Sequence, residues 1–360
     1  MNHLGKRLLY FAVPALAALT GCMDAGVSGR STVPYVEEIL SGENGALALF
    51  SDFDPRETRG SIALVGPYDS LLSARFLTVD DYDNIDARTA PDGLPDFAGE
   101  QIDIVEDADA AAYFESYGAD AAGMRTAAVR NLVMSMESRC SIGAFDDEMN
   151  QEKLPAKMVV FTSPFNAVAG AFDIDTLCRH TGCSIPVVFP VRTVLEHQLD
   201  RNIEHLHVAV LTDSVTATSG VYQQLFDEIS LAKGILGTGC VAFSRGSSLS
   251  MNSIIAGYKA AGGNMPVSAL IIDDGSVQAE EVEASLEEIR NIQNEANLNS
   301  RKLITKDFVV VDMQKAVTDE CYRILRKNNI FTHNIAYPAM KRYVTVKSST
   351  GGGYNLVEKD

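Results

Sequence analysis

Tryptophan is absent from the 360 residues, and the six histidines are widely spaced along the chain. A glycan-binding platform built on stacked indole rings is therefore disfavoured, although tyrosine and phenylalanine remain available for stacking. The sequence also contains no H-E-x-x-H, G-x-S-x-G, Walker A or G-x-G-x-x-G motif. Zinc proteases, serine hydrolases, P-loop NTPases and dinucleotide enzymes thus lose their usual sequence support.

Positive charge is scarce as well. The chain has 30 Lys and Arg residues against 48 Asp and Glu residues, which gives a formal net charge of −18. An acidic surface repels phosphate backbones, and no cluster of basic residues offsets that repulsion, so we expect no nucleic-acid partner. The composition is 46% hydrophobic and 22% charged, close to the globular average, and therefore predicts a packed core.

The N-terminus has the three parts of a secretory signal. A lysine–arginine pair precedes an apolar segment over 8–18, which is too short to span a membrane. This segment leads into "LTGC" (19–22), which resembles the bacterial lipobox. The resemblance implies that a signal peptide, 1–21, is removed and that Cys22 carries acyl chains such as palmitate, which anchor the protein in a membrane. An ordinary secretory signal or an anchor helix is the alternative.

The residues after Cys22 bear on location. Met23 stands where an aspartate favours inner-membrane retention in many Gram-negative bacteria, so the outer membrane of the cell envelope is favoured over the inner one. Residues 22–60 are rich in Gly, Ser, Asp and Glu and are expected to form a lipidated tether, with a short helix near 35–40.

Five cysteines remain after Cys22, an odd number that cannot pair completely. The segment "CRHTGC" (178–183) holds two of them, but its spacing is not that of a zinc site. We expect buried or loosely paired thiols and no metal, with a Cys178–Cys183 disulfide as the alternative. The other three are Cys140, Cys240 and Cys321.

Short runs rich in valine and isoleucine alternate with amphipathic stretches between residues 61 and 320. Most of the runs are continuously apolar, which is typical of parallel strands covered on both faces. This alternation predicts right-handed βαβ units and an α/β fold. The expected strands are 61–66, 101–106, 157–163, 185–190, 206–212, 239–244, 267–273 and 307–312.

Eight strands are too many for one small lobe. We therefore expect two similar Rossmann-like lobes with mainly parallel sheets that face a cleft, over 61–204 and 205–330. A C-terminal segment, 331–360, is expected to return to the first lobe. The longest amphipathic stretch, 278–297, predicts a single helix with an apolar stripe that includes Ile292.

Two segments carry a resemblance to a known family. "VAVLTDSVTATSGVYQQLF" (208–226) and "FVVVDMQKAVTDECYRIL" (308–325) are similar to patterns of the aspartate/glutamate racemase superfamily. The resemblance implies two α/β lobes across a cleft and proton abstraction by a cysteine at a strand end in each lobe. The matching strand ends here, "VVFTSPFN" and "LIIDDGS", carry no cysteine, and a hydroxyl is a poor replacement for a thiolate. The element order also resembles that of type I periplasmic binding proteins.

Ligands of open parallel sheets gather at the carboxyl ends of the strands, where loops and helix N-termini converge. In this region Arg245 is suited to gripping a carboxylate, and Asp213 and Asp273 to binding an amine. The alternative is that these aspartates, and the serines after Arg245, only cap helices. The candidate ligand-binding residues are Asp69, Ser70, Thr162, Ser163, Thr212, Asp213, Ser214, Ser219, Ser244, Arg245, Ser247 and Asp273.

These features favour a lipid-anchored envelope protein that binds a small polar, carboxylate-bearing ligand between its lobes, without catalysis and without a cofactor. Such a protein delivers a solute to a transporter or reports it to a sensor. A racemase-like or related isomerase or lyase is the second hypothesis. A non-catalytic envelope scaffold, whose cleft is filled by apolar side chains, is the third.

Overall fold

The computed structural model describes residues 30–43, 45–84, 88–115, 121–143, 149–201, 203–334, 336–349 and 353–359. Residues from Ser31 onward form one compact unit. The expected signal peptide, Cys22 and the start of the tether lie outside the described residues. Within the described part, no helix combines the length and the apolar character needed to cross a bilayer.

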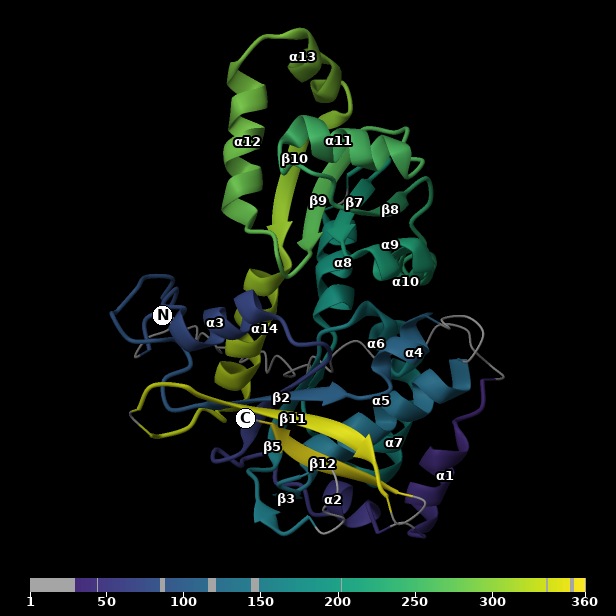
Figure 1. The fold of residues 1–360 in the computed structure, drawn as a ribbon, viewed down its shortest axis with the longest axis vertical. Coiled ribbons are helices and arrows are strands. Elements are labelled where there is room, and N and C mark those ends of the chain that lie inside the picture. The colour runs from purple at the N-terminus through teal and green to yellow at the C-terminus, as the bar shows by residue number, and fades with distance from the viewer. Residues whose placement is uncertain are drawn as a thin grey trace, which may run out of the picture. The chain divides into compact units, whose positions relative to one another are not determined.

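A six-stranded sheet has the strand order β12-β11-β2-β1-β5-β6 (Figure 1). Its pairings are parallel except for the antiparallel hairpin of β11 and β12. β1 and β5 are buried along their whole length, as expected for strands covered on both faces. The strands are β1 (Ser61–Val65), β2 (Gln101–Asp107), β5 (Ala156–Phe161), β6 (Val187–Val188), β11 (Ala339–Lys347) and β12 (Tyr354–Lys359).

A second sheet of four strands, all parallel, has the order β10-β9-β7-β8. Both sheets alternate strands with helices, so the prediction of an α/β fold with mainly parallel sheets is confirmed. Each of the eight predicted apolar runs contains a strand. The strands of this sheet are β7 (His207–Thr212), β8 (Gly239–Ser244), β9 (Val267–Asp273) and β10 (Ile304–Asp312).

Helices cover both sheets, and a further two-stranded ladder pairs β3 (Arg139–Cys140) with β4 (Gln151–Glu152). Around the first sheet lie α3 (Ser70–Thr78), α4 (Ala110–Glu115), α5 (Ala121–Met136), α6 (Pro164–Ala169), α7 (Ala171–Thr181) and α8 (Pro190–Asp200). Around the second lie α9 (Ser214–Ser219), α10 (Val221–Ala232), α11 (Met251–Ala260), α12 (Ala279–Asn291), α13 (Glu295–Arg301) and α14 (Met313–Asn328).

The two sheets share an apolar core. One cluster of buried side chains includes Leu64 and Val160 from the first sheet together with Val208 and Ile271 from the second. α14 follows β10 and packs against α3 and α8, so it joins the two halves (Figure 1). The apolar contact holds the carboxyl edges of both sheets in one compact unit.

The segment 278–297 is not the single helix that the sequence predicts. α12 ends at Asn291, and Ile292 has an extended backbone and is 48% exposed, so it does not belong to the buried stripe. Asn294 then caps α13, because its side chain accepts a hydrogen bond from the backbone N–H of Asn297 at 2.8 Å. A capping asparagine competes with helix continuation, which explains the break.

The tether assignment is wrong for part of the segment 22–60. α1 (Pro34–Ser41) and α2 (Leu47–Ser51) pack on the first lobe, and Val36, Ile39 and Phe50 are buried there. Their apolar side chains recur at helical spacing and contact the cluster that also contains residues of α5 and α7. Burial of this stripe stabilises a folded cover where the composition alone indicates a flexible chain.

Candidate functional site

The carboxyl ends of the second sheet line up in register. Thr212 is paired with both Asp273 and Ser244, and Asp312 is paired with Ile272. Two aspartates at this edge cap the helices that follow. Asp213 accepts backbone hydrogen bonds from residues 215 and 216 at 2.9 and 3.0 Å, and Asp312 accepts one from residue 314 at 2.9 Å.

Asp273 is held differently, because no helix begins at its side chain. The phenol of Tyr222 on α10 donates a hydrogen bond to its Oδ2, and the hydroxyl of Thr212 donates to its carbonyl oxygen at 3.3 Å. Tyr222 is fully buried. The carboxyl group is therefore fixed in place by a side chain that reaches it from the core.

The edge of the first sheet contributes Asp69. Its Oδ1 accepts hydrogen bonds from the backbone N–H groups of residues 71 and 72 at 2.8 and 3.0 Å, which caps α3. Asp69 touches the second lobe: a Cβ built on Gly275 lies only 2.7 Å from the carboxyl carbon of Asp69. The loops after β1 and β9 are therefore in direct contact.

Five carboxyl groups from the two lobes share this region, and we call them the inter-lobe aspartate cluster. Asp69 feels the charges of Asp274 and Asp312, and Asp273 feels those of Asp213, Asp69 and Asp274. The cluster consists of Asp69, Asp213, Asp273, Asp274 and Asp312.

Burial is the largest influence on two members of this cluster. Loss of hydration raises the pKa of Asp273 from 3.8 to about 7, the hydrogen bond from Tyr222 opposes the rise, and the neighbouring carboxylates add to it. Loss of hydration also raises the pKa of Asp69, against the effect of its two backbone hydrogen bonds. A carboxyl group with a pKa near 7 exchanges a proton readily at neutral pH.

Arg245 lies at the rim of the cluster. Its Nε is 4.0 Å from Oδ2 of Asp274, and its side chain is 50% exposed. Asp213 is also exposed to solvent. The cluster is therefore reached from the side where Arg245 and Asp213 lie.

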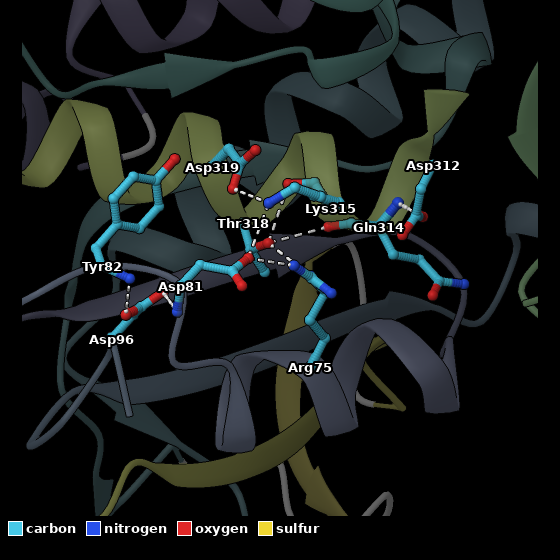
Figure 2. A network of polar contacts seen from close by, with 9 residues as sticks. All are labelled: Arg75, Asp81, Tyr82, Asp96, Asp312, Gln314, Lys315, Thr318 and Asp319. Atoms are coloured by element: carbon cyan, nitrogen blue, oxygen red, sulfur yellow. Dashed lines mark hydrogen bonds and ion pairs between the residues drawn. The ribbon is translucent and has the colours of Figure 1, made fainter. Parts of the chain in front are cut away.

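A network around α14 positions two members of the cluster (Figure 2). Asp312 begins α14, and Asp69 begins α3. Arg75 on α3 donates to the hydroxyl of Thr318 on α14 at 3.0 Å, and both Arg75 and Lys315 pair with Asp81, at 2.7 and 2.8 Å. These bonds tie the two helices together and so limit the separation of the two carboxyl groups.

Asp96 supports the same network from below the loop. It accepts hydrogen bonds from the backbone N–H groups of Asp81 and Tyr82 at 3.1 and 3.0 Å (Figure 2). Burial raises its pKa to about 6. The loop that carries Asp81 is therefore anchored to the protein interior.

The remaining predicted residues do not join the cluster through their side chains. Thr162 donates to the carbonyl of Val65 at 3.3 Å, and Ser219 donates to that of Thr216 at 2.7 Å. Ser163 is buried before α6 without a capping bond, and Ser250, not Ser247, caps α11. Ser70, Ser214, Ser244 and Ser247 are exposed.

Two residues of the site were missed by the sequence analysis. Asp312 ends an apolar strand just as Asp273 does, so the same pattern pointed to it. Tyr222 lies on the buried stripe of α10, where an aromatic residue indicates core packing. No local signal shows that its hydroxyl reaches Asp273, 51 residues further along the chain.

The thiols expected of racemase chemistry are not at the cluster. Cys240 is the second residue of β8, at the end opposite the cluster, and is 2% exposed, and Cys321 on α14 is fully buried. Burial raises the pKa of both thiols. Proton transfer at this site therefore falls to carboxyl groups among the described residues.

Two cavities lie elsewhere, and neither is lined by a predicted site residue. One of about 20 Å³, enough for a single water molecule, is lined by Gly66, Asp107, Tyr113 and Asn131. The other, of about 820 Å³, lies between α8 and α14 and is lined by residues that include Tyr322. In the described part of the chain, no group of three or more His, Cys, Asp or Glu residues is arranged to hold a metal ion.

Comparison with known proteins gives structural likeness alone. No family model matches the sequence, and no curated protein matches it. The chain is similar to a glutamate racemase from Bacillus anthracis (TM-score 0.47, 11% identity, covering 81% of this chain and 90% of that one). It is also similar to a glutamate racemase from Francisella tularensis (0.46, 14%, 81% and 90%) and to an aspartate racemase homologue from Pyrococcus horikoshii (0.38, 11%, 74% and 99%). At TM-scores below 0.5, these likenesses decide neither the ligand nor the reaction.

Proposed function

We propose that the protein binds a small ligand carrying a cationic nitrogen at the inter-lobe aspartate cluster, and that Arg245 engages a carboxylate of the same ligand. The observation that supports this proposal is the convergence of five carboxyl groups from two lobes around Asp273. Their mutual repulsion favours any cation that settles among them. An amino-acid-like ligand satisfies both the acidic cluster and the rim arginine.

The ligand approaches from the exposed side of the cluster. Asp213 and Arg245 stand at the solvent boundary, whereas Asp273 lies deeper behind Tyr222. A positive charge near Asp273 stabilises its carboxylate and lowers its pKa. Binding at pH 7 is therefore expected to release protons, and the observed enthalpy is expected to depend on the ionisation enthalpy of the buffer.

A thermal-shift screen of the purified protein against amines, amino acids, dicarboxylates and sugars tests the proposal. Calorimetry on any hit then compares Arg245→Ala, Asp213→Asn and the control Glu283→Gln on the exposed face of α12. Loss of a charged hydrogen bond in Arg245→Ala should weaken binding by at least ~1.5 kcal/mol, about tenfold. Unchanged affinity in both cluster variants would remove the cluster from the binding site.

The membrane anchor is a second part of the proposal. The lipobox supports acylation at Cys22, attachment to the cell envelope with the outer membrane favoured, and delivery of the ligand to a transporter or a sensor. Cys22→Ser should move the protein from the membrane fraction to the soluble fraction and abolish incorporation of labelled palmitate. A variant that stays in the membrane fraction would argue for a different anchor.

A racemase-like or related isomerase is the second candidate. The raised pKa values of Asp69 and Asp273, carboxyl groups that come from opposite lobes, favour it. One group would remove a proton from a substrate carbon, and the other would return a proton from the opposite side. The test is exchange of the α-hydrogen of amino acids in D₂O, followed by NMR, with Asp273→Asn as the inactive comparison. Ligand binding without exchange would leave the binding function, and absence of both would favour the scaffold hypothesis.

A further inference from the structure

The C-terminus of α7 brings two cysteines together. The helix ends at Thr181, and Gly182 follows in the left-handed conformation with φ 70°. In such a cap, the residue after the glycine packs against the residue about one turn before it. These two residues are Cys183 and Cys178, and both pack against the apolar cluster of the first lobe.

The two thiols also contact each other. The Cys178 thiol and the Cys183 sulfur form a hydrogen bond. That bond, together with one from the backbone N–H of Ile185, lowers the pKa of Cys183, whereas the same contact raises the pKa of Cys178. Cys183 is therefore the better thiolate of the pair.

The other described cysteines differ from this pair in their exposure. Cys140, Cys240 and Cys321 are at most 2% exposed, whereas Cys178 and Cys183 are partly exposed. A reagent in solution therefore meets the α7 pair first, and the buried thiols serve as internal controls.

We propose that Cys178 and Cys183 are a reversible dithiol–disulfide site that closes the C-terminal cap of α7. The oxidant is a disulfide, either glutathione disulfide or a disulfide-carrying oxidoreductase. The Cys183 thiolate attacks one sulfur of that disulfide and expels a thiolate, which leaves a mixed disulfide. The Cys178 thiolate then attacks the Cys183 sulfur and expels the second thiol. Two electrons pass to the oxidant, two protons leave the protein thiols, and one S–S bond replaces another.

The experiment uses the purified full-length protein in its native state. It is incubated with glutathione disulfide, alkylated, and then digested with trypsin, which cleaves after Arg179 between the two cysteines. The disulfide therefore keeps two tryptic peptides joined, with a mass lower by two hydrogens than their sum. We expect this linked pair to form, and dithiothreitol to separate it, while the three buried thiols become alkylated only after denaturation.

Single variants test the order of the steps. In Cys178→Ser the resolving thiol is missing, so Cys183 should accumulate one stable glutathione adduct. In Cys183→Ser the adduct on Cys178 should form more slowly. Circular dichroism confirms that each variant is folded. Free thiols at both positions in the wild-type protein after the incubation, or a linkage that joins other cysteines, would overturn the proposal. Neither outcome depends on ligand binding at the aspartate cluster.

Discussion

Replacement of Asp273 by asparagine removes a carboxyl group whose charge the fold disfavours. The pKa of Asp273 rises from 3.8 to about 7 in the folded protein, mainly because burial strips water from the carboxylate. A difference of about three pKa units between folded and unfolded states corresponds to about 4 kcal/mol in the free energy of unfolding. Asparagine has nearly the same shape and keeps an oxygen that accepts from Tyr222.

The sign of the effect follows from proton binding. Between about pH 4 and pH 7 the folded protein holds the Asp273 proton more tightly than the unfolded chain does. The free energy of unfolding therefore falls as the pH rises through this window, and the loss is complete above about pH 7. The amide introduced by Asp273→Asn does not titrate, so the variant lacks this contribution. Asp96, with a pKa of about 6, titrates in both proteins and cancels in the comparison.

Urea unfolding between pH 4.5 and 8 measures the difference, followed by far-ultraviolet circular dichroism because the chain has no tryptophan. Asp273→Asn should resemble the wild type at pH 4.5 and gain up to about 4 kcal/mol relative to it at pH 8. The gain is an upper value, since Tyr222 bonds a carboxylate more strongly than an amide. As a control, Asp213→Asn keeps a capping oxygen and should change stability by less than ~1 kcal/mol at every pH. A wild-type-to-variant difference that stays constant over the whole pH range would refute the reasoning.

Two further substitutions test the packing around the site. Phe50→Ala empties a side-chain position that is 1% exposed on α2, and should lower the free energy of unfolding by about 3–5 kcal/mol, whereas Leu236→Ala, at 83% exposure, should change it by less than ~0.5 kcal/mol. Equal effects of these two would return residues 34–51 to the tether. Gly275→Ala places a methyl group 2.7 Å from the Asp69 carboxyl carbon and should cost about 1–3 kcal/mol, compared with little change in Gly143→Ala, which has open space around it. Equal stability of the two glycine variants would mean that the lobes do not touch at Asp69.

Local patterns in the sequence were sufficient for the strands and for most helices. A parallel strand buried on both faces must be apolar along its length, so runs such as that of β9 identify themselves without any partner. The aspartates at the strand ends could be placed at one edge of each sheet for a similar reason, since parallel strands present their carboxyl ends together. The break after α12 was missed because the apolar spacing continues to Ile292 while the asparagine cap acts against it.

The sequence by itself therefore determined the α/β architecture and the acidic character of the strand ends, because both follow from residues close together in the chain. Only the tertiary structure decided which carboxyl groups meet. Asp69 lies against Gly275 of the other lobe, far away in sequence, and Tyr222 reaches Asp273 from within the core. The raised pKa values depend on burial and on charges brought together by folding, and neither quantity is encoded in a single strand or helix.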